Sequence, residues 1–237
     1  MFETTRWSLV LAAGSDDSVA AREALAALCD TYWYPLYAYA RRRGADVEDA
    51  RDLTQAFFAS LIERRDFERV RRERGRFRAF LLASLQHFMA NDAAHRRAVK
   101  HGGHVTFVPI APLALEQAES RYGVEPADAS TPETLYERRW ALTVIDRVLA
   151  ALRQEWDAKS RADEFDELKA CLMRETPPGG YAGVATRLGL TEGAVKVAVH
   201  RLRRKFQEQL RHDIAHTVSD PADVDDEIRY LLRALDA

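Results

Sequence analysis

Apolar residues recur at helical spacing along most of the chain, and the clearest pattern lies within residues 181–206. A short apolar patch there predicts one helix that ends at Gly189, because glycine readily adopts the left-handed conformation that closes a helix. Thr191 is a candidate N-cap for a second helix. The apolar residues of that second helix share one face of a 3.6-residue period and are Val195, Val199, Leu202 and Phe206. Two helices joined by so tight a turn predict a helix-turn-helix.

The first hundred residues contain three further helical patterns. The first spans residues 20–43, is rich in aromatic residues and includes Pro35 as a candidate kink. The second begins after Asp46, which has the side chain of an N-cap. The third follows an arginine-dense segment at residues 64–78. The N-terminal part of the chain is therefore predicted to be a small bundle of helices.

The helical periodicity weakens after Gly103. Residues 105–132 contain four prolines and little periodicity beyond a short patch at residues 113–122, and a linker of about 30 residues is longer than an ordinary connection within a domain. A last amphipathic pattern at residues 220–235 predicts a helix with Asp220 as its N-cap and Pro221 in its first turn. Its expected apolar stripe is Val224, Ile228, Leu231, Leu232 and Leu235.

These patterns predict an all-α protein of two helical domains joined by an acidic, Pro-containing linker. The helix-turn-helix belongs to the second domain, and a helical extension follows it at the C-terminus. The expected bounds of the first domain, linker, second domain and acidic extension are, in order, 1–101, 102–132, 133–211 and 212–237. A chain of 237 residues, 47% of them hydrophobic, is long enough to bury two cores.

The net charge of −2 conceals a sorting of charge along the chain. Residues 41–101 carry a net charge of +6 and residues 181–211 carry +5. The acidic segments 102–137 and 212–237 carry −5 each. Two separated basic segments favour two contacts with nucleic acid made by one chain.

The cations of the second helix of the helix-turn-helix lie away from its apolar face, as expected of a helix that enters a DNA major groove. These residues are Lys196, His200, Arg201, Arg203 and Arg204. The alternative is an amphipathic core helix whose basic side is only solvated. The segment at residues 64–78 combines arginines with phenylalanines, which is typical of single-stranded DNA binding.

The sequence contains no motif that indicates an enzyme. No phosphate-binding glycine loop, His-Glu-x-x-His motif or nucleophile elbow is present, so we expect no enzyme, no cofactor and no metal. His101 and His104 lack a third ligand at a suitable spacing, and Cys29 and Cys171 are expected to be buried thiols. Without a membrane-spanning run or a signal pattern, we expect a cytoplasmic protein with no membrane insertion.

Three stretches, in order, resemble parts of bacterial sigma factors. Residues 46–58 are similar to the acidic helix that binds the clamp of RNA polymerase, and residues 77–97 to the helix for the melted promoter element. Residues 181–206 resemble the helix-turn-helix that reads the upstream element. The order and spacing are similar to small two-domain sigma factors of the extracytoplasmic-function type over roughly residues 20–211.

The resemblance implies a factor that binds core RNA polymerase and promoter DNA, directs transcription initiation and catalyses nothing itself. It leaves room for an anti-sigma factor or another regulator. The implied polymerase-binding residues are Glu48, Asp49, Asp52 and Gln55. The implied contacts to the melted element are Arg74, Arg76, Arg78, Gln86, His87, Asn91, Arg96 and Arg97. The contacts to the upstream element would be Thr191, Lys196, Val197, His200, Arg201, Arg203 and Arg204.

The chain departs from this family pattern at three places. Ala56 stands where the clamp helix usually has a glutamate, Val197 and Ala198 replace more polar residues of the recognition helix, and residues 212–237 extend beyond the usual end. The competing hypotheses are a helix-turn-helix regulator that acts without recruiting polymerase, and a helical interaction protein with solvated basic faces. We expect the C-terminal extension to complete the second domain's core; a second hypothesis is that its acidic side also screens the DNA-binding surface.

Overall fold

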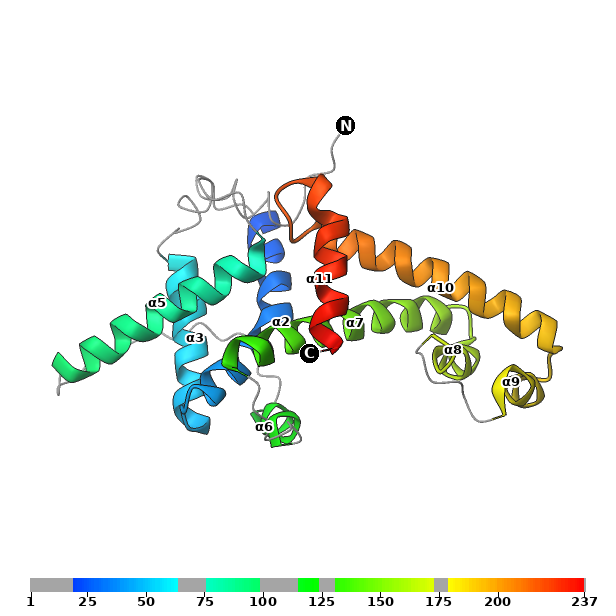
Figure 1. The fold of residues 1–237 in the computed structure, drawn as a ribbon, viewed down its shortest axis with the longest axis horizontal. Helices are drawn as coiled ribbons and strands as arrows, with labels where there is room; N and C mark the ends of the chain where they lie inside the picture. Colours follow the sequence, from blue (N-terminus) through cyan, green and yellow to red (C-terminus); the bar gives the residue numbers. More distant parts are fainter. Residues whose placement is uncertain (1–18, 64–75, 99–114, 124–130, 173–178, 237) are drawn as a thin grey trace. The chain divides into compact units, whose positions relative to one another are not determined.

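The computed structural model describes residues 19–63, 76–98, 115–123, 131–172 and 179–236, and these are predominantly helical (Figure 1). The prediction of an all-α protein is confirmed for these ranges. Extended pairing within them is limited to an isolated antiparallel bridge between Arg76 and Val218. Among the same residues, no helix combines the length and apolar character needed to cross a membrane.

The chain divides into two compact units, one made of residues 1–143 and 214–237 and the other of residues 144–213. The described helices of the first unit are α2 (Val19–Arg42), α3 (Val47–Glu63), α5 (Phe77–Ala98), α6 (Leu115–Gly123), the start of α7 (Pro132–Asp157), the 3-10 turn η1 (Pro221–Asp223) and α11 (Val224–Asp236). The second unit contains the rest of α7, α8 (Ala162–Lys169), α9 (Gly180–Leu188) and most of α10 (Glu192–Ala215).

The core of the first unit is built from aromatic side chains of α2, α3, α5 and the start of α7. Tyr32 and Phe77 meet edge to face with ring centroids 5.1 Å apart. The Trp140 indole N–H donates to the Tyr32 hydroxyl at 3.1 Å, and the Tyr136 hydroxyl donates to the Arg78 carbonyl at 2.9 Å. These contacts bind the first turns of α7 to α2 and α5. The division therefore differs from the expected one, which assigned α7 from residue 133 to the second domain.

The N-terminus of α3 forms as its sequence predicts. The backbone N–H of Asp49 donates to the Asp46 carboxylate at 2.8 Å, which satisfies one of the unpaired donors of the first turn. Gly44, with φ of +96°, turns the chain out of α2 just before this cap.

Part of the expected linker is an ordered helix packed on α2. Ala118 of α6 is buried, and the two carboxylate oxygens of Glu119 accept hydrogen bonds from Arg41 at 2.9 and 3.2 Å. The Tyr37 hydroxyl donates to the same carboxylate. A segment of the expected linker, 102–132, thus forms the helix α6, which a charged and hydrogen-bonded partner on α2 holds.

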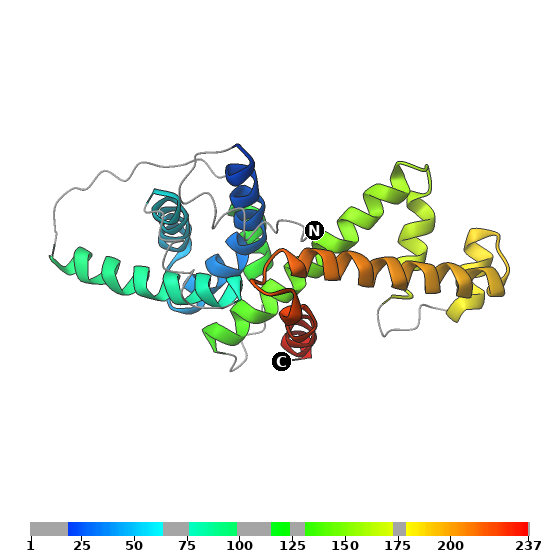
Figure 2. The same cartoon turned by 90° about the horizontal axis from the view of Figure 1, so that it is seen from above.

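The core of the second unit lies between the end of α7 and the three helices that follow it. Its fully or nearly buried apolar residues are Val148, Leu152, Phe165, Leu168, Val184, Val195, Val199 and Leu202. Within this unit α9 and α10 meet at the short turn that connects them (Figure 2).

The C-terminal extension packs in the first unit, so the expectation that it completes the second domain's core is wrong. Its N-terminus follows the prediction: the Asp220 carboxylate accepts from the Ala222 N–H at 2.9 Å, and Pro221 opens the turn that leads into α11. Its apolar stripe differs, because Leu232 is 52% exposed whereas Glu227 is only 1% exposed. The carboxylate of Glu227 thus shares the buried face of this helix with Val224, Leu231 and Ala234.

Candidate nucleic-acid interface

The turn between α9 and α10 is closed by hydrogen bonds at both helix ends. Gly189 adopts the left-handed conformation, and the backbone N–H of Leu190 donates to the backbone carbonyl of Ala185 at 2.9 Å, as in a Schellman motif. Thr191 then caps α10, because its hydroxyl accepts from the Ala194 N–H at 3.2 Å. The direction of α10 relative to α9 is therefore fixed locally by these few residues.

One side of α10 is buried and the other faces solvent. Val195, Val199 and Leu202 are at most 2% exposed. The predicted upstream-element residues, all exposed, are Thr191, Lys196, Val197, His200, Arg201, Arg203 and Arg204. The packing of the apolar side therefore holds a basic surface outward, which is the arrangement that groove recognition requires.

These cations differ in how they are engaged within the protein. Lys196 pairs with Glu192 at 2.7 Å and Arg204 with Glu208 at 3.2 Å, both as exposed pairs one helical turn apart. Such pairs contribute little to stability, and a phosphate can replace the carboxylate. Within the described part of the chain, His200 and Arg201 have no partner.

Arg203 has a structural contact that the sequence does not predict. Its Nη2 donates to the carbonyl of Cys171, just after α8, at 2.9 Å. This bond ties α10 to the residues just after α8 and uses one of the five N–H donors of the Arg203 guanidinium. Cys171 itself is a buried free thiol, as expected, and burial raises its pKa. The Cys29 side chain lies outside the described residues.

The acidic side chains predicted to bind polymerase lie on the first half of α3. Glu48 and Asp49 are exposed, whereas Asp52 and Gln55 are half-buried. Arg51 lies between two of the acids, 2.6 Å from Glu48 and 3.0 Å from Asp52, and its hydrogen bond to Asp52 raises its pKa. The predicted acidic surface is therefore partly neutralised by its own helix.

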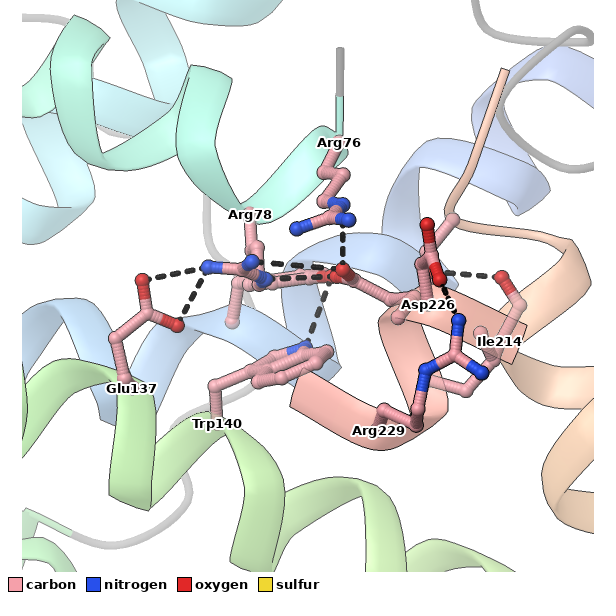
Figure 3. A network of polar contacts seen from close by, with 10 residues as sticks. Arg76, Arg78, Glu137, Trp140, Ile214, Asp226 and Arg229 are labelled. Atoms are coloured by element: carbon pink, nitrogen blue, oxygen red, sulfur yellow. Dashed lines mark hydrogen bonds and ion pairs between the residues drawn. The ribbon is translucent and has the colours of Figure 1, made fainter. Parts of the chain in front are cut away.

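Arg78, predicted to contact melted DNA, is covered in this structure. It is 4% exposed: its Nε donates to Glu227 at 2.7 Å, and its Nη1 donates to both oxygens of Glu137 at 2.6 and 2.7 Å. Arg76, also predicted to contact DNA, pairs with the second oxygen of Glu227 at 2.9 Å. Figure 3 shows Arg78 above the Trp140 indole, with Glu137 on one side.

The pKa values of this cluster reflect burial and mutual charge. Burial alone lowers the pKa of Arg78, but the hydrogen bond to Glu227 and the charges of both carboxylates outweigh it and raise the pKa. Burial, with the nearby charge of Glu227, also raises the pKa of Glu137 despite the opposing effect of Arg78. The arginine therefore stays charged, and its two acidic partners repel each other.

The other described residues predicted for the melted element, Gln86, His87 and Asn91, lie on α5. Gln86 on α5 donates to the Tyr39 hydroxyl at 3.0 Å and to Glu133 at 3.2 Å. His87 and Asn91 are exposed on the same helix. Arg74 and the side chains of Arg96 and Arg97 lie outside the described residues, as does the segment with His101 and His104.

Sequence reasoning missed the partners that cover Arg78. Glu137 and Glu227 lie 59 and 149 positions away, and Tyr230 places its ring centroid 3.6 Å from the Arg78 guanidinium. One signal was available for Glu227. It falls three residues after Val224 and four before Leu231, so it shares the apolar face of its helix.

No protein-family model matches the chain, and no curated protein or solved structure matches it. The residues that the structure describes include no group of three or more His, Cys, Asp or Glu side chains placed to hold a metal ion. A functional assignment therefore depends on the residues and geometry described above.

Proposed function

We propose that this protein is a sigma factor, similar to the extracytoplasmic-function type, that binds core RNA polymerase and directs promoter recognition. The observation that carries the proposal is the α9–α10 pair. A turn of three residues, closed by Gly189 and capped by Thr191, fixes the direction of α10 relative to α9. The apolar side of α10 is buried and its predicted DNA-binding cations face solvent. This arrangement supports a helix-turn-helix whose second helix would enter a major groove.

On duplex DNA, the residues of α10 have separate roles. His200 and Arg201, which keep their polar groups unengaged within the described residues, would donate to base edges. Lys196 and Arg204 would exchange exposed carboxylates for phosphates. The exposed Val197 offers an apolar contact for a thymine methyl group. Arg203 serves the fold through Cys171.

Polymerase binding is assigned to α3. Glu48 and Asp49 lie in its first turn, at the positive end of the helix dipole, where acidic side chains are favourable, and Asp52 follows one turn later. The support for these residues as a docking surface is the family resemblance of residues 46–58, together with the exposure of Glu48 and Asp49. Arg51 would have to release Glu48 or Asp52 when a basic partner surface approaches.

The test is a pull-down with bacterial core RNA polymerase, followed by run-off transcription on a library of promoters. Asp52→Lys should abolish polymerase binding, and Asp163→Lys, a charge reversal at an exposed residue of α8, should leave it unchanged. Equal binding by wild type and Asp52→Lys would remove α3 as the contact. Specific duplex binding without any polymerase binding would make the protein a regulator, and the absence of salt-dependent DNA affinity would leave a helical interaction protein.

A further inference from the structure

The contact between α11 and the start of α5 is built around one buried carboxylate. Glu227, 1% exposed, accepts from Arg78 through both oxygens, at 2.7 and 3.4 Å, and pairs with Arg76 through one of them. Burying a carboxylate is costly, and only its two cationic partners offset that cost. The position of α11 on this surface therefore depends on the ion pairs of Glu227 with Arg76 and Arg78.

A second group of α11 covers the flat face of Arg78. The Tyr230 ring centroid lies 3.6 Å from the guanidinium carbon, and the Trp140 ring lies 5.1 Å from the same atom. The guanidinium edge is fixed by Glu137, which belongs to α7 and does not depend on α11. Arg78 would thus keep its orientation if α11 moved away.

Together, Glu227 and Tyr230 present an anion and an aromatic face to Arg76 and Arg78. A nucleotide presents the same two groups, a phosphate for a charge-assisted hydrogen bond and a base that stacks on a guanidinium plane. We infer that Arg76 and Arg78 form a subsite for one nucleotide of a single strand, which α11 closes by putting Glu227 in the place of the phosphate and Tyr230 in the place of the base. The inference rests on the proposed function only in taking melted promoter DNA as the natural strand.

The closing helix is suited to leave. Its thirteen residues are too few for a stable isolated helix in water, so its order depends on the surface it covers. It buries Val224, Leu231 and Ala234 but leaves Leu232 half exposed. When α11 leaves, Arg78 retains Glu137, whereas Arg76 loses the carboxylate of Glu227, so the opened surface gains positive charge.

The test compares two variants of the full chain that each remove one charge from α11. Glu227→Gln removes the anion bound to both arginines, whereas Asp226→Asn removes an exposed anion that pairs with Arg229 on the same helix. Binding of a short labelled oligothymidylate is measured by fluorescence anisotropy over a range of KCl concentrations. We expect Glu227→Gln to bind about tenfold more tightly than wild type, with a salt slope steeper by about 0.7, the value for one additional phosphate of a single strand.

Asp226→Asn should bind within about twofold of wild type, because a diffuse change of one charge is screened by salt. Equal affinities for the two variants would overturn the inference. A loss of affinity in Glu227→Gln relative to Asp226→Asn would overturn it as well.

Hydrogen exchange on the wild type provides a measurement that does not depend on the variant's stability. Addition of the oligonucleotide should raise the exchange rates of the α11 amides, because the strand displaces the helix. Bound oligonucleotide with unchanged or stronger protection of α11 would contradict the inference. Neither experiment contains polymerase, so failure here leaves the sigma-factor proposal standing, and failure of the polymerase pull-down leaves this subsite standing.

Discussion

On α10 the cations face solvent, whereas at the start of α5 an arginine of the other basic segment lies beneath two carboxylates. Arg201 is exposed and without a partner in the described part of the chain, and Arg204 meets only an exposed glutamate. Arg78 is 4% exposed and bound by Glu137 and Glu227. The two segments carry nearly the same net charge, +5 and +6. Charge along a sequence therefore indicates an electrostatic character, but the fold decides which cations a ligand can reach.

Breaking an arginine–carboxylate pair also costs a different free energy on α10 than at the start of α5. An exposed pair such as Arg204 with Glu208 is worth about 0.2–1 kcal/mol, because water already solvates both charges well. Breaking a buried pair by removing one partner costs about 3–5 kcal/mol, because the remaining charge stays away from water. His200 and Arg201 of α10 are thus accessible for binding, whereas Arg78 of α5 is committed to the fold as long as α11 is in place.

The largest expected effect is on stability. Arg78→Ala leaves Glu137 and Glu227 buried without their shared cation, and we expect the free energy of unfolding to fall by about 3–5 kcal/mol. Arg201→Ala removes an exposed arginine and should change it by less than about 0.5 kcal/mol. Urea denaturation followed by circular dichroism measures both. Similar small losses for the two variants would contradict the burial of Arg78.

The second prediction separates two neighbours on α10. Arg201→Ala should weaken binding to a duplex selected from random sequence by about 1–3 kcal/mol, because it removes a donor to a base edge. Arg203→Ala should instead lower stability by about 1 kcal/mol, through the lost bond to Cys171, with less effect on duplex affinity. Electrophoretic shift and thermal melting of both variants provide the comparison. If Arg203→Ala weakened DNA binding more than Arg201→Ala, the assignment of roles would be reversed.

Local features of the fold could be predicted from the sequence because their causes are local. The caps at Asp46, Thr191 and Asp220 and the closing role of Gly189 each depend on a few consecutive residues. Helical periodicity likewise places Val195, Val199 and Leu202 in a core without knowledge of what covers them.

The carboxylates that bind Arg78 and Arg41 are distant in the sequence, so these ion pairs could not be predicted from it. Glu227 lies 149 positions from Arg78, and Glu119 lies 78 positions from Arg41. A carboxylate within the apolar face of α11 indicated a buried cation, but the sequence contains 35 lysines and arginines that could provide it. The periodic patch at residues 113–122 likewise gave no sign that α6 packs on α2.

The carboxylates that bind Arg41 and Arg78 also differ from each other, because their contributions to the free energy of unfolding depend on pH in opposite ways. Burial alone raises the pKa of Glu119, but hydrogen bonds from Tyr37 and Arg41 lower it below its ordinary value of 4.5. Glu119 therefore contributes stability above that value and loses it as the pH falls through its folded pKa. Glu137 has a raised pKa, so its contribution is fully present below 4.5 and is lost as the pH rises through its folded pKa.

The two signs can be separated by unfolding wild type, Glu119→Gln and Glu137→Gln in urea at several pH values. The stability of wild type relative to Glu119→Gln should shrink on acidification below 4.5. The stability of wild type relative to Glu137→Gln should shrink as the pH rises above 4.5. Parallel pH dependence in the two comparisons would show that the environments of these carboxylates are alike.

The smallest expected effect is that of Glu208→Gln, the exposed counterpart of Glu227→Gln. Its pair with Arg204 spans one turn of α10, so its loss should cost only about 0.3–0.5 kcal/mol of stability. Glu208 is a better choice than Glu192, because an acid in the first turn of a helix also interacts favourably with the helix dipole. Duplex binding should tighten slightly in low salt and match wild type in high salt, because the removed charge is solvated and screened. A gain in duplex affinity that persisted in high salt, and was as large as the gain expected for Glu227→Gln on single strands, would contradict this prediction. It would mean that Glu208 holds Arg204 as firmly as Glu227 holds Arg78, so that the basic surfaces of α10 and α5 would not differ as their burial indicates.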